Sequence, residues 1–313
     1  MNHHVVIGAG PVGSGVASLL AQRGTPVTVI TRSGSGPDHP LITKVTADAA
    51  DTEALVRAAN GAAAIYNCAN PPYHRWPIEW PPIHRALLVA AERTGAVLVM
   101  MDNLYGFGAG SAMPMREGDA LHAAGEKGAV RATMAREVLA AHASGRLRAT
   151  LARASDFYGP RVHGAVLGDR VLPKVLASKK VSVLGSLDIP HSISFMPDVV
   201  ETLVTIAGDE RAWGKPWHVP NSPAVSQREH VQALAAAATT TVAVSAVPRI
   251  AISALGLFSP MMRGLKETWY QFAEPWVTDS TLTEQTFRLT ATPLAEGAEA
   301  TIAWWRAQPA VSK

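Results

Sequence analysis

The sequence has only one cysteine, Cys68, and charged side chains make up only 17% of its 313 residues. A lone cysteine excludes a disulfide within the chain and is typical of a reducing compartment. No apolar run reaches about 18 residues, the length that indicates a membrane span. The hydrophobic fraction of 48% is ample for a large buried core. We therefore expect a cytoplasmic protein that does not enter the membrane.

Clusters of basic side chains and metal-ligand spacings are also missing. The net charge is +3 and the lysines and arginines are scattered, which argues against nucleic acid as a partner. The histidines lack the i, i+4 or cysteine-paired spacing of zinc sites, and the adjacent His3 and His4 stand at the start of a predicted strand. The sequence therefore predicts no metal site.

A glycine-rich turn near the N-terminus gives the strongest positive signal. Residues 5–7 form an apolar, β-branched strand, and Gly8-Ala9-Gly10-Pro11-Val12-Gly13 follows it directly. A helical pattern then runs to Arg23, and residues 27–30 form a second apolar strand. This strand–turn–helix–strand order is the context that a dinucleotide-binding fingerprint requires. The alternative is a glycine-rich turn that binds no ligand.

Each glycine of this turn has a separate role in such a site. Gly8 permits the tight turn, Gly10 lets the backbone approach a pyrophosphate, and Gly13 lets the helix pack closely on the strand. Pro11 and Val12 begin the helix, whose free N–H groups favour a phosphate charge. We therefore predict that residues 8 and 10–13 bind a dinucleotide cofactor.

The end of the second strand indicates which dinucleotide is bound. NAD sites place an acidic residue there, whereas an arginine accommodates the 2′-phosphate of NADP. This chain has Thr31-Arg32-Ser33 and no acid. Arg32 can pair with a phosphate and Ser33 can add a hydroxyl donor. We expect NADP(H) to be preferred and NAD(H) to be the alternative; Arg32 could instead be a solvated loop residue.

Apolar strands and helical patterns alternate through the first half of the chain. Strands are predicted at residues 5–7, 27–30, 42–45, 62–66, 96–101 and 147–153, and helices at 11–23, 51–57, 83–93 and 127–143. The proline- and aromatic-rich stretch 71–82 is expected to be a loop. Such alternation predicts an α/β fold of the Rossmann type, a doubly wound parallel sheet covered on both faces. Its ligand crevice should lie at the carboxyl ends of the strands.

The second half of the chain has a different and less regular pattern. Helices are expected at 166–176, 198–207, 226–238 and 293–306, with short strands at 181–184, 192–195 and 217–220. Ser226 and Glu229 form a capping box, and Thr292 is expected to cap the last helix. We predict a dinucleotide-binding domain over 1–155 and a smaller α/β substrate-binding portion over 156–313, with some of its elements returning to the first domain.

Three motifs of the chain resemble those of a known family. The turn Asp156-Phe157-Tyr158-Gly159-Pro160, the segment Phe195-Met196-Pro197-Asp198-Val199 and the stretch from Thr292 to Gly297 are similar to the extended short-chain dehydrogenase/reductases, the NAD(P)-dependent sugar epimerase/dehydratase group. The resemblance covers essentially the whole chain. The glycine spacing is one residue shorter than is usual there, which suggests an atypical branch.

The resemblance implies positions for cofactor, substrate and partner. Asp48 would contact adenine, and Ala69 and Asn70 would lie against the cofactor. Substrate would face Asn103, Asp156 and His191, which are also named only by the resemblance. The family further implies a homodimer.

The catalytic pair of that family, a tyrosine followed four residues later by a lysine, is missing. The five tyrosines are Tyr66, Tyr73, Tyr105, Tyr158 and Tyr270, and the residues four positions later are Asn70, Pro77, Ala109, Val162 and Glu274. At the place expected for the pair, the chain has Lys127 and Arg131. Met101-Asp102-Asn103 replaces the family's serine or threonine.

We therefore expect Lys127, Arg131, Asp102 and Tyr105 to form the catalytic region. Arg131 would position the cofactor, since an arginine does not release a proton. Lys127, or else Tyr105, Asp102 or His191, would handle the proton. The alternatives are that both cations are exposed to solvent, that Tyr105 packs in the core, and that His191 has no role beyond structure.

Three functions fit these residues. The first is an NADP(H)-dependent oxidoreductase or epimerase of atypical mechanism that acts on a small carbonyl or hydroxyl substrate. The second is a protein that binds NADP(H) without turnover, as a redox sensor or scaffold. The third is a redox-neutral isomerase that holds its cofactor tightly.

Overall fold

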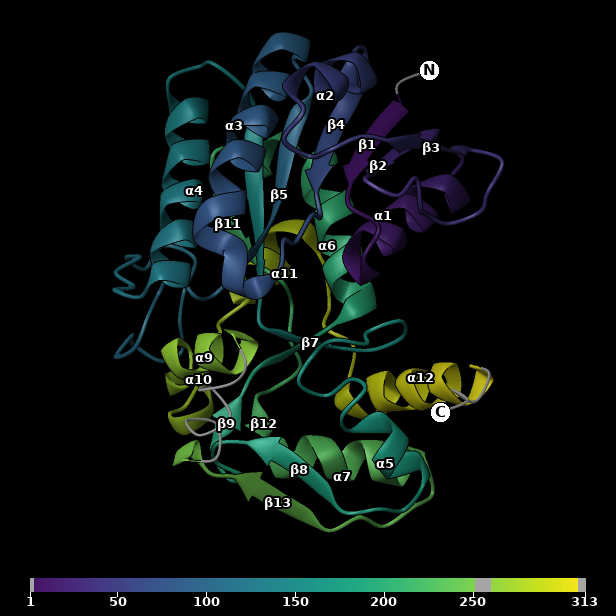
Figure 1. Cartoon of the computed structure of the whole chain (residues 1–313), viewed down its shortest axis with the longest axis vertical. Helices are drawn as coiled ribbons and strands as arrows, with labels where there is room; N and C mark the ends of the chain where they lie inside the picture. The colour runs from purple at the N-terminus through teal and green to yellow at the C-terminus, as the bar shows by residue number, and fades with distance from the viewer. Residues whose placement is uncertain (1–2, 251–259, 309–313) are drawn as a thin grey trace. The chain divides into compact units, whose positions relative to one another are not determined.

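The protein, described by a computed structural model over residues 3–250 and 260–308, divides into two compact units (Figure 1). Unit 1 comprises Met1–Gly108, Glu117–Ala154 and Val199–Val219. Unit 2 comprises Ala109–Arg116, Ser155–Asp198 and Pro220–Lys313.

Unit 1 is built on a seven-stranded parallel sheet with the order β11-β6-β5-β4-β1-β2-β3. The strands are β1 His3–Ile7, β2 Val27–Thr31, β3 Ile42–Thr46, β4 Ala62–Asn67, β5 Val97–Asn103, β6 Ala149–Ala154 and β11 Pro216–His218. The order β3-β2-β1-β4-β5-β6 is that of the Rossmann fold. The predicted fold class is therefore confirmed, and the central strands are apolar because the sheet is buried on both faces there, whereas the edge strand β3 is largely exposed.

Helices connect these strands and bury the sheet. They are α1 Pro11–Gln22, α2 Thr52–Ala59, α3 Trp76–Thr94, α4 Glu126–Ala143, α6 Met196–Gly208 and the short η2 Glu210–Ala212. Side chains of α2, α3 and α4 share one core with Ile65 and Leu98 of the sheet. Asp51 caps α2, because its Oδ1 accepts a hydrogen bond from the N–H of Ala54 at 3.0 Å. Gly95, at φ +71°, ends α3.

The expected loop at 71–82 is wrong. A 3₁₀ turn, η1 (Tyr73–Arg75), leads directly into α3, so the helix begins at Trp76 and contains Pro81 and Pro82. Trp76 and Trp80 are 4% and 1% exposed and lie one helical turn apart on the buried face. Burial of two large aromatic side chains at helical spacing outweighs the cost of two prolines inside the helix.

The strands of unit 2 are short and pair in three separate two-stranded ladders, β10-β7, β12-β9 and β13-β8. Its strands are β7 Asp156–Tyr158, β8 Val181–Leu184, β9 Pro190–His191, β10 Ile193–Phe195, β12 Val225–Ser226 and β13 Val244–Val247. Its helices are α5 Leu172–Leu176, α7 Gln227–Ala237, α9 Pro260–Glu267, α10 Tyr270–Ala273, α11 Thr281–Phe287 and α12 Leu294–Ala307. Leu172, Leu234 and Ile302 belong to its separate core.

Two details of unit 2 differ from the sequence-based expectation, and one agrees. The helix expected at 166–176 is only α5, because a Cβ at Gly168 would lie 1.8 Å from the carbonyl oxygen of His163 and the chain turns tightly there. Thr292 does not cap α12; its N–H and hydroxyl donate to Asp198 at 2.8 and 2.7 Å. The capping box of Ser226 and Glu229 is confirmed.

Candidate functional site

The glycine-rich turn after β1 is packed so tightly that two of its positions accept only glycine. Gly8 has φ +95°, and a Cβ there would lie 2.8 Å from the amide nitrogen of Ala69. A Cβ at Gly13 would lie 1.9 Å from the carbonyl oxygen of Gly8. The turn is therefore pressed between the end of β4 and the first turn of α1, as the sequence predicted for these two glycines.

Gly10 is different because a Cβ at this position would meet no atom within 4 Å. Gly10 is the N-cap of α1, and no side chain caps the helix. The first turn contains no acidic residue, and Pro11 occupies its start, with Val12 and Gly13 following. Free N–H groups at an uncapped helix N-terminus attract anions. The turn thus offers backbone donors and open space to a phosphate group.

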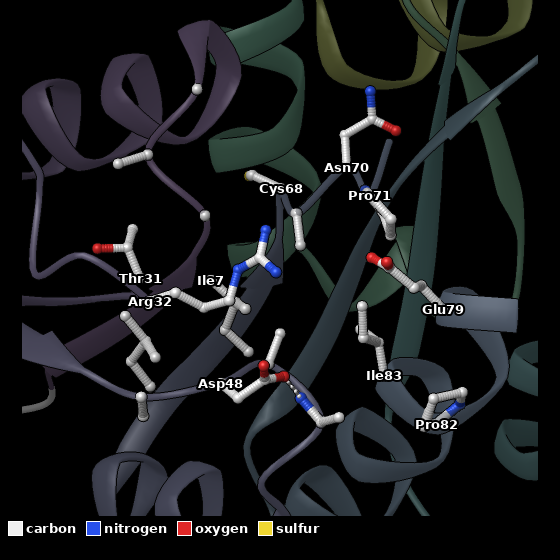
Figure 2. A pocket seen from close by; sticks show the side chains of 18 of the residues that line it. Ile7, Thr31, Arg32, Asp48, Cys68, Asn70, Pro71, Glu79, Pro82 and Ile83 are labelled. Carbon is white, nitrogen blue, oxygen red and sulfur yellow. Dashed lines mark hydrogen bonds between the residues drawn. The ribbon is translucent and has the colours of Figure 1, made fainter. Parts of the chain in front are cut away.

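A cavity of about 760 Å³ adjoins this turn within unit 1 (Figure 2). Its walls come from the carboxyl ends of β1, β2, β3 and β4 and from the start of α3. Seven residues predicted to bind cofactor are among those that line it: Gly8, Gly10, Arg32, Ser33, Asp48, Ala69 and Asn70. The volume is typical of a small-molecule site. Because the cavity combines this size with an uncapped helix and a bare glycine, its residues fit a dinucleotide.

Arg32 is the cation that follows β2, and no described residue neutralises its charge. The side chain is exposed and has no hydrogen-bond or ion-pair partner among the described residues. Figure 2 shows it reaching into the middle of the cavity. The neighbouring Ser33 hydroxyl donates to Ser35 at 2.9 Å, and Asp48 Oδ1 accepts from the N–H of Ala50 at 2.8 Å. This wall therefore presents one unpaired guanidinium.

The opposite wall was missed by sequence reasoning because it belongs to η1 and to the unexpected first turns of α3. Arg75, Ile78, Glu79, Pro82 and Ile83 line the cavity there. Arg75 and Glu79 form an ion pair one helical turn apart, and Ile78 is 71% exposed. The helical spacing of Trp76, Trp80 and Ile83 was the signal that could have placed these residues on a helix.

A second group of predicted residues forms a buried charge cluster between β5, β6 and α4. Arg131 donates from Nε to Asp102 Oδ1 at 2.9 Å and from Nη2 to the carbonyl oxygen of Met101 at 2.6 Å. Arg153 on β6, which sequence reasoning missed, donates from Nε to Asp102 Oδ2 at 3.2 Å. All three charged side chains are at most 5% exposed. Asp102 therefore holds two guanidinium groups at once.

Aromatic rings surround the cations of α4. The Arg131 guanidinium lies 5.0 Å from the Trp80 ring, and the Lys127 ammonium lies 4.9 Å from the Tyr73 ring. The Tyr105 ring packs edge-on against the Tyr73 ring, with 6.2 Å between the ring centroids. Lys127 and Arg131 are 6% and 5% exposed, so the alternative that they are exposed cations is wrong.

The structure thus brings Lys127, Arg131, Asp102 and Tyr105 together, but none of them is among the described residues that line the cavity. Asn103, named for substrate, instead accepts a hydrogen bond from the N–H of Tyr105 at its Oδ1, at 3.1 Å. That bond stabilises the turn after β5. The charged residues of the cluster are buried and pack against aromatic rings, and they do not line the cavity.

The other two residues named for substrate meet in unit 2. His191 Nε2 lies 2.9 Å from Asp156 Oδ2, and His191 Nδ1 lies 3.0 Å from the carbonyl oxygen of Gln271. The His191 side chain is 3% exposed and that of Asp156 is 20% exposed. Burial and the nearby His191 lower the pKa of His230 to about 4. His230 is therefore neutral at pH 7.

Neither a metal site nor a membrane-spanning helix is found among residues 3–250 and 260–308. No three histidine, cysteine, aspartate or glutamate side chains gather there in a way that could hold a metal ion. None of the helices in these ranges combines the length and apolar character needed to span a bilayer.

Comparisons with known proteins agree with this geometry. The model of the NAD dependent epimerase/dehydratase family matches residues 4–219, which confirms the resemblance seen in the sequence. No curated protein matches the sequence significantly.

Solved structures match over nearly the full length. WbmH of Bordetella bronchiseptica, in complex with NAD+, has a TM-score of 0.75 at 19% identity, over 98% of this chain and 99% of that one. UDP-N-acetylglucosamine 4-epimerase of Bacillus cereus has a TM-score of 0.79 at 12% identity, over 100% and 99%. The DesIV double mutant (dTDP-glucose 4,6-dehydratase) of Streptomyces venezuelae, with NAD and DAU bound, has 0.78 at 18%, over 97% of each chain. At these identities the likeness shows a shared fold.

Proposed function

The chain belongs to the NAD dependent epimerase/dehydratase family, and we propose that this epimerase/dehydratase-type enzyme prefers NADP(H) over NAD(H) and acts on a small carbonyl or hydroxyl substrate. The observation that carries the cofactor preference is Arg32, which stands unpaired in the cavity at the end of β2. No acidic residue is present there to accept hydrogen bonds from a 2′-hydroxyl. A guanidinium pairs well with the 2′-phosphate that distinguishes NADP from NAD.

Different residues of the cavity would bind different parts of this cofactor. The turn at Gly10 and the N-terminus of α1 would bind the pyrophosphate, and Arg32 and Ser33 would bind the 2′-phosphate. Asp48, Ala69 and Asn70 would lie along the nucleoside. When bound, the cofactor supplies hydride chemistry, and the protein supplies orientation.

The hydrogen bonds within the buried charge cluster argue against Asp102 and Arg131 as proton donors. Both carboxylate oxygens of Asp102 already accept hydrogen bonds from arginines, and Arg131 already donates to Asp102 and Met101. We infer that these two residues keep α4 and β5 in place rather than move a proton. Lys127, Tyr105 and His191 remain as the candidates for that step. If Lys127→Ala retained full turnover, the lysine would have no part in it.

The family name and the names of the similar structures support a first choice of substrate class. UDP-N-acetylglucosamine 4-epimerase and dTDP-glucose 4,6-dehydratase are named for nucleotide-linked sugars. Such sugars carry the hydroxyl groups that hydride chemistry requires. Nucleotide sugars and small ketones therefore form the first substrate panel.

The test is a titration of NADPH and NADH against wild type, Arg32→Gln and Arg32→Glu. A charge-assisted contact is worth about 1.5–3 kcal/mol, so we expect Arg32→Gln to weaken NADPH binding by roughly 10- to 100-fold and NADH binding far less. Arg85→Gln is the matched control, because Arg85 is an exposed arginine of α3 that does not line the cavity. Wild-type protein that binds NADH as tightly as NADPH would overturn the proposal.

A protein that binds NADP(H) without turnover is the second candidate, favoured by two observations. No tyrosine of the sequence is followed four residues later by a lysine, and the donors of Arg131 are largely engaged. Transfer of deuterium from labelled NADPH to the substrate panel separates the candidates: an enzyme transfers label and a sensor does not. Co-purified nucleotide with product formation but no net change in absorbance would instead indicate redox-neutral isomerisation.

We also propose a reducing, cytoplasmic location and a homodimer, which rest on the lone Cys68 and on the family resemblance. Light scattering on the purified protein measures its mass in solution. A monomer of 33.0 kDa would contradict the dimer.

A further inference from the structure

One face of α3 and the residue before it line the cavity of unit 1 and expose apolar side chains there. The lining residues are spaced as on a single helix face, at i, i+3, i+4, i+7 and i+8: Arg75, Ile78, Glu79, Pro82 and Ile83. Ile78 is 71% exposed although its side chain is large and apolar. Figure 2 shows Glu79 and Ile83 extending from α3 into the cavity, across from Arg32. An exposed apolar surface inside a cavity is typical of a ligand-binding wall.

The two charged side chains of this face neutralise each other. Arg75 Nε forms an ion pair with Glu79 Oε1 across one helical turn. An uncharged ring that approaches the face therefore meets the apolar side chains of Ile78, Pro82 and Ile83. Ile83 is only 8% exposed, whereas Ile78 and Pro82 are exposed, so these two supply most of the apolar contact surface.

Pro82 also changes the backbone of this face. In an α-helix the carbonyl oxygen of Ile78 would accept a hydrogen bond from the N–H of residue 82, and a proline has no N–H. Because that bond cannot form, the helix leaves the carbonyl oxygen of Ile78 without its usual donor. Ile78 and Pro82 both line the cavity, so this oxygen lies at the cavity wall. The face thus combines an apolar surface with a hydrogen-bond acceptor.

The proposed phosphate sites determine which part of the cofactor reaches α3. In NADP the 2′-phosphate, the adenine and the pyrophosphate are all attached to one ribose. With its phosphates at Arg32 and Gly10, the adenine is surrounded by the ends of β3 and β4 and by the face of α3. Of these three walls, α3 carries the largest apolar side chains. Adenine is a flat ring whose 6-amino group donates hydrogen bonds, so it suits both features of α3.

We propose that Ile78 and Pro82 hold the adenine ring of the cofactor and that the carbonyl oxygen of Ile78 accepts a hydrogen bond from its 6-amino group. This inference rests on the proposed function, because it takes the cavity to be the NADP(H) site. NADPH and NADH share the adenine, so the α3 face contributes equally to the binding of both, whereas Arg32 distinguishes them. Ile78 and Pro82 then determine which base is bound, separately from the choice of phosphate.

The carbonyl contact is tested by titration with NADPH and with its hypoxanthine analogue, in which an oxygen replaces the 6-amino group. A hydrogen bond changes affinity by roughly three- to ten-fold, so wild type should prefer NADPH by that factor. Pro82→Ala restores the N–H that bonds to Ile78 within the helix, and the preference should fall below about two-fold. Alanine is a better helix former than proline, so the variant keeps the helix.

Pro81→Ala is the matched control for this substitution. It restores an N–H in the same way, to the carbonyl oxygen of Pro77, but Pro81 is exposed and is not among the described residues that line the cavity. This variant should keep the wild-type preference for NADPH over the analogue. Pro82→Ala with the wild-type preference would overturn the carbonyl contact, and so would a wild type that binds both dinucleotides equally.

The apolar contact is tested by Ile78→Ala. The loss of side-chain carbons that pack on the adenine should weaken NADPH and NADH binding alike, by roughly five- to ten-fold, and leave the ratio of the two affinities unchanged. Leu282→Ala is the control, at a 52% exposed leucine of α11 in unit 2, and should change neither affinity. Ile78→Ala with wild-type affinity for both cofactors would overturn the apolar contact.

These titrations separate the adenine contact from the proposed function. Equal affinities for NADPH and NADH would overturn the cofactor preference, and the adenine contact would then be decided by NADH and its own hypoxanthine analogue. A preference for NADPH over NADH without any preference for adenine would overturn the contact alone. A wild type that binds none of these dinucleotides would overturn both.

Discussion

Two arginines of unit 1 were both predicted to bind the cofactor, and the structure gives them opposite surroundings. Arg32 is exposed at the end of β2, lines the cavity and has no protein partner among the described residues. Arg131 on α4 is 5% exposed, donates to Asp102 and Met101, and lies over the Trp80 ring. The same residue type thus stands in an open site and in a closed one.

The difference separates ligand binding from structural support. A guanidinium without a protein partner can form charge-assisted bonds with a ligand at little cost. A guanidinium that already fills a buried carboxylate would have to break those bonds first, which leaves a buried charge unpaired. We therefore propose that the cavity around Arg32 selects the cofactor and that the cluster around Asp102 stabilises the fold locally.

The largest expected effect is on that cluster. Asp102→Asn removes the negative charge between Arg131 and Arg153 and leaves two buried cations. Removal of one partner from a buried ion pair typically costs about 3–5 kcal/mol in the free energy of unfolding. Urea denaturation measures this change. The control is Asp38→Asn, which removes an exposed partner of Lys44 and should leave the midpoint unchanged. If both substitutions lowered the free energy of unfolding equally, the buried cluster would contribute no more to stability than an exposed ion pair.

The second prediction concerns His230 in unit 2, whose burial should keep it uncharged and make the stability of the protein depend on pH. Burial and the nearby His191 lower the pKa of His230 to about 4, from 6.5 in the unfolded chain. Between these values the unfolded state binds more protons, so stability is fully present above pH 6.5 and is lost as the pH falls towards 4. The loss should reach roughly 3 kcal/mol at pH 4.

Urea midpoints at pH 7, 6, 5 and 4 measure this loss. His230→Gln should remove its share of the pH dependence, whereas His163→Gln, at an exposed histidine, should keep the wild-type profile. Identical slopes for wild type and His230→Gln would show that His230 is not held neutral by the fold.

A third prediction concerns two glycines of the same turn. A Cβ at Gly13 would overlap the carbonyl oxygen of Gly8, so Gly13→Ala should cost about 1–3 kcal/mol in unfolding free energy. Gly10→Ala has room for its methyl group and should cost less than about 1 kcal/mol. Titration with NADPH should show weaker binding for Gly10→Ala, because the methyl group enters the space left for the pyrophosphate. A well-folded Gly10→Ala with wild-type affinity would remove Gly10 from the site.

The sequence predicted the sheet and the glycine turn because their physical signals are local. A run such as Val5-Val6-Ile7 identifies a buried strand by its side chains alone, and Gly8 identifies a position with positive φ. The capping box at Ser226 and Glu229 also depends on residues three apart. These features require no knowledge of distant partners.

The features that were missed depend on tertiary packing. The start of α3 has a proline-rich sequence, and the burial of Trp76 and Trp80 against the sheet decides that it is helical. Arg153 inside the apolar β6 was a visible sign of a buried ion pair. Its partner Asp102 follows only from the adjacency of β5 and β6 in the sheet.

The smallest expected effect distinguishes the two arginine environments by their response to salt. The screening length falls from about 10 Å at 0.1 M salt to about 3 Å at 1 M, and exposed charges are screened far more than buried ones. Because Arg32 is exposed, NADPH binding should weaken several-fold more than NADH binding over this range, and Arg32→Gln should abolish the difference. The Asp102 cluster is buried, so the penalty of Asp102→Asn in urea should change little with salt. If salt weakened NADPH and NADH binding equally, the extra phosphate of NADPH would not be bound by an exposed cation. Arg32 would then be no better a candidate for binding the cofactor than Arg131.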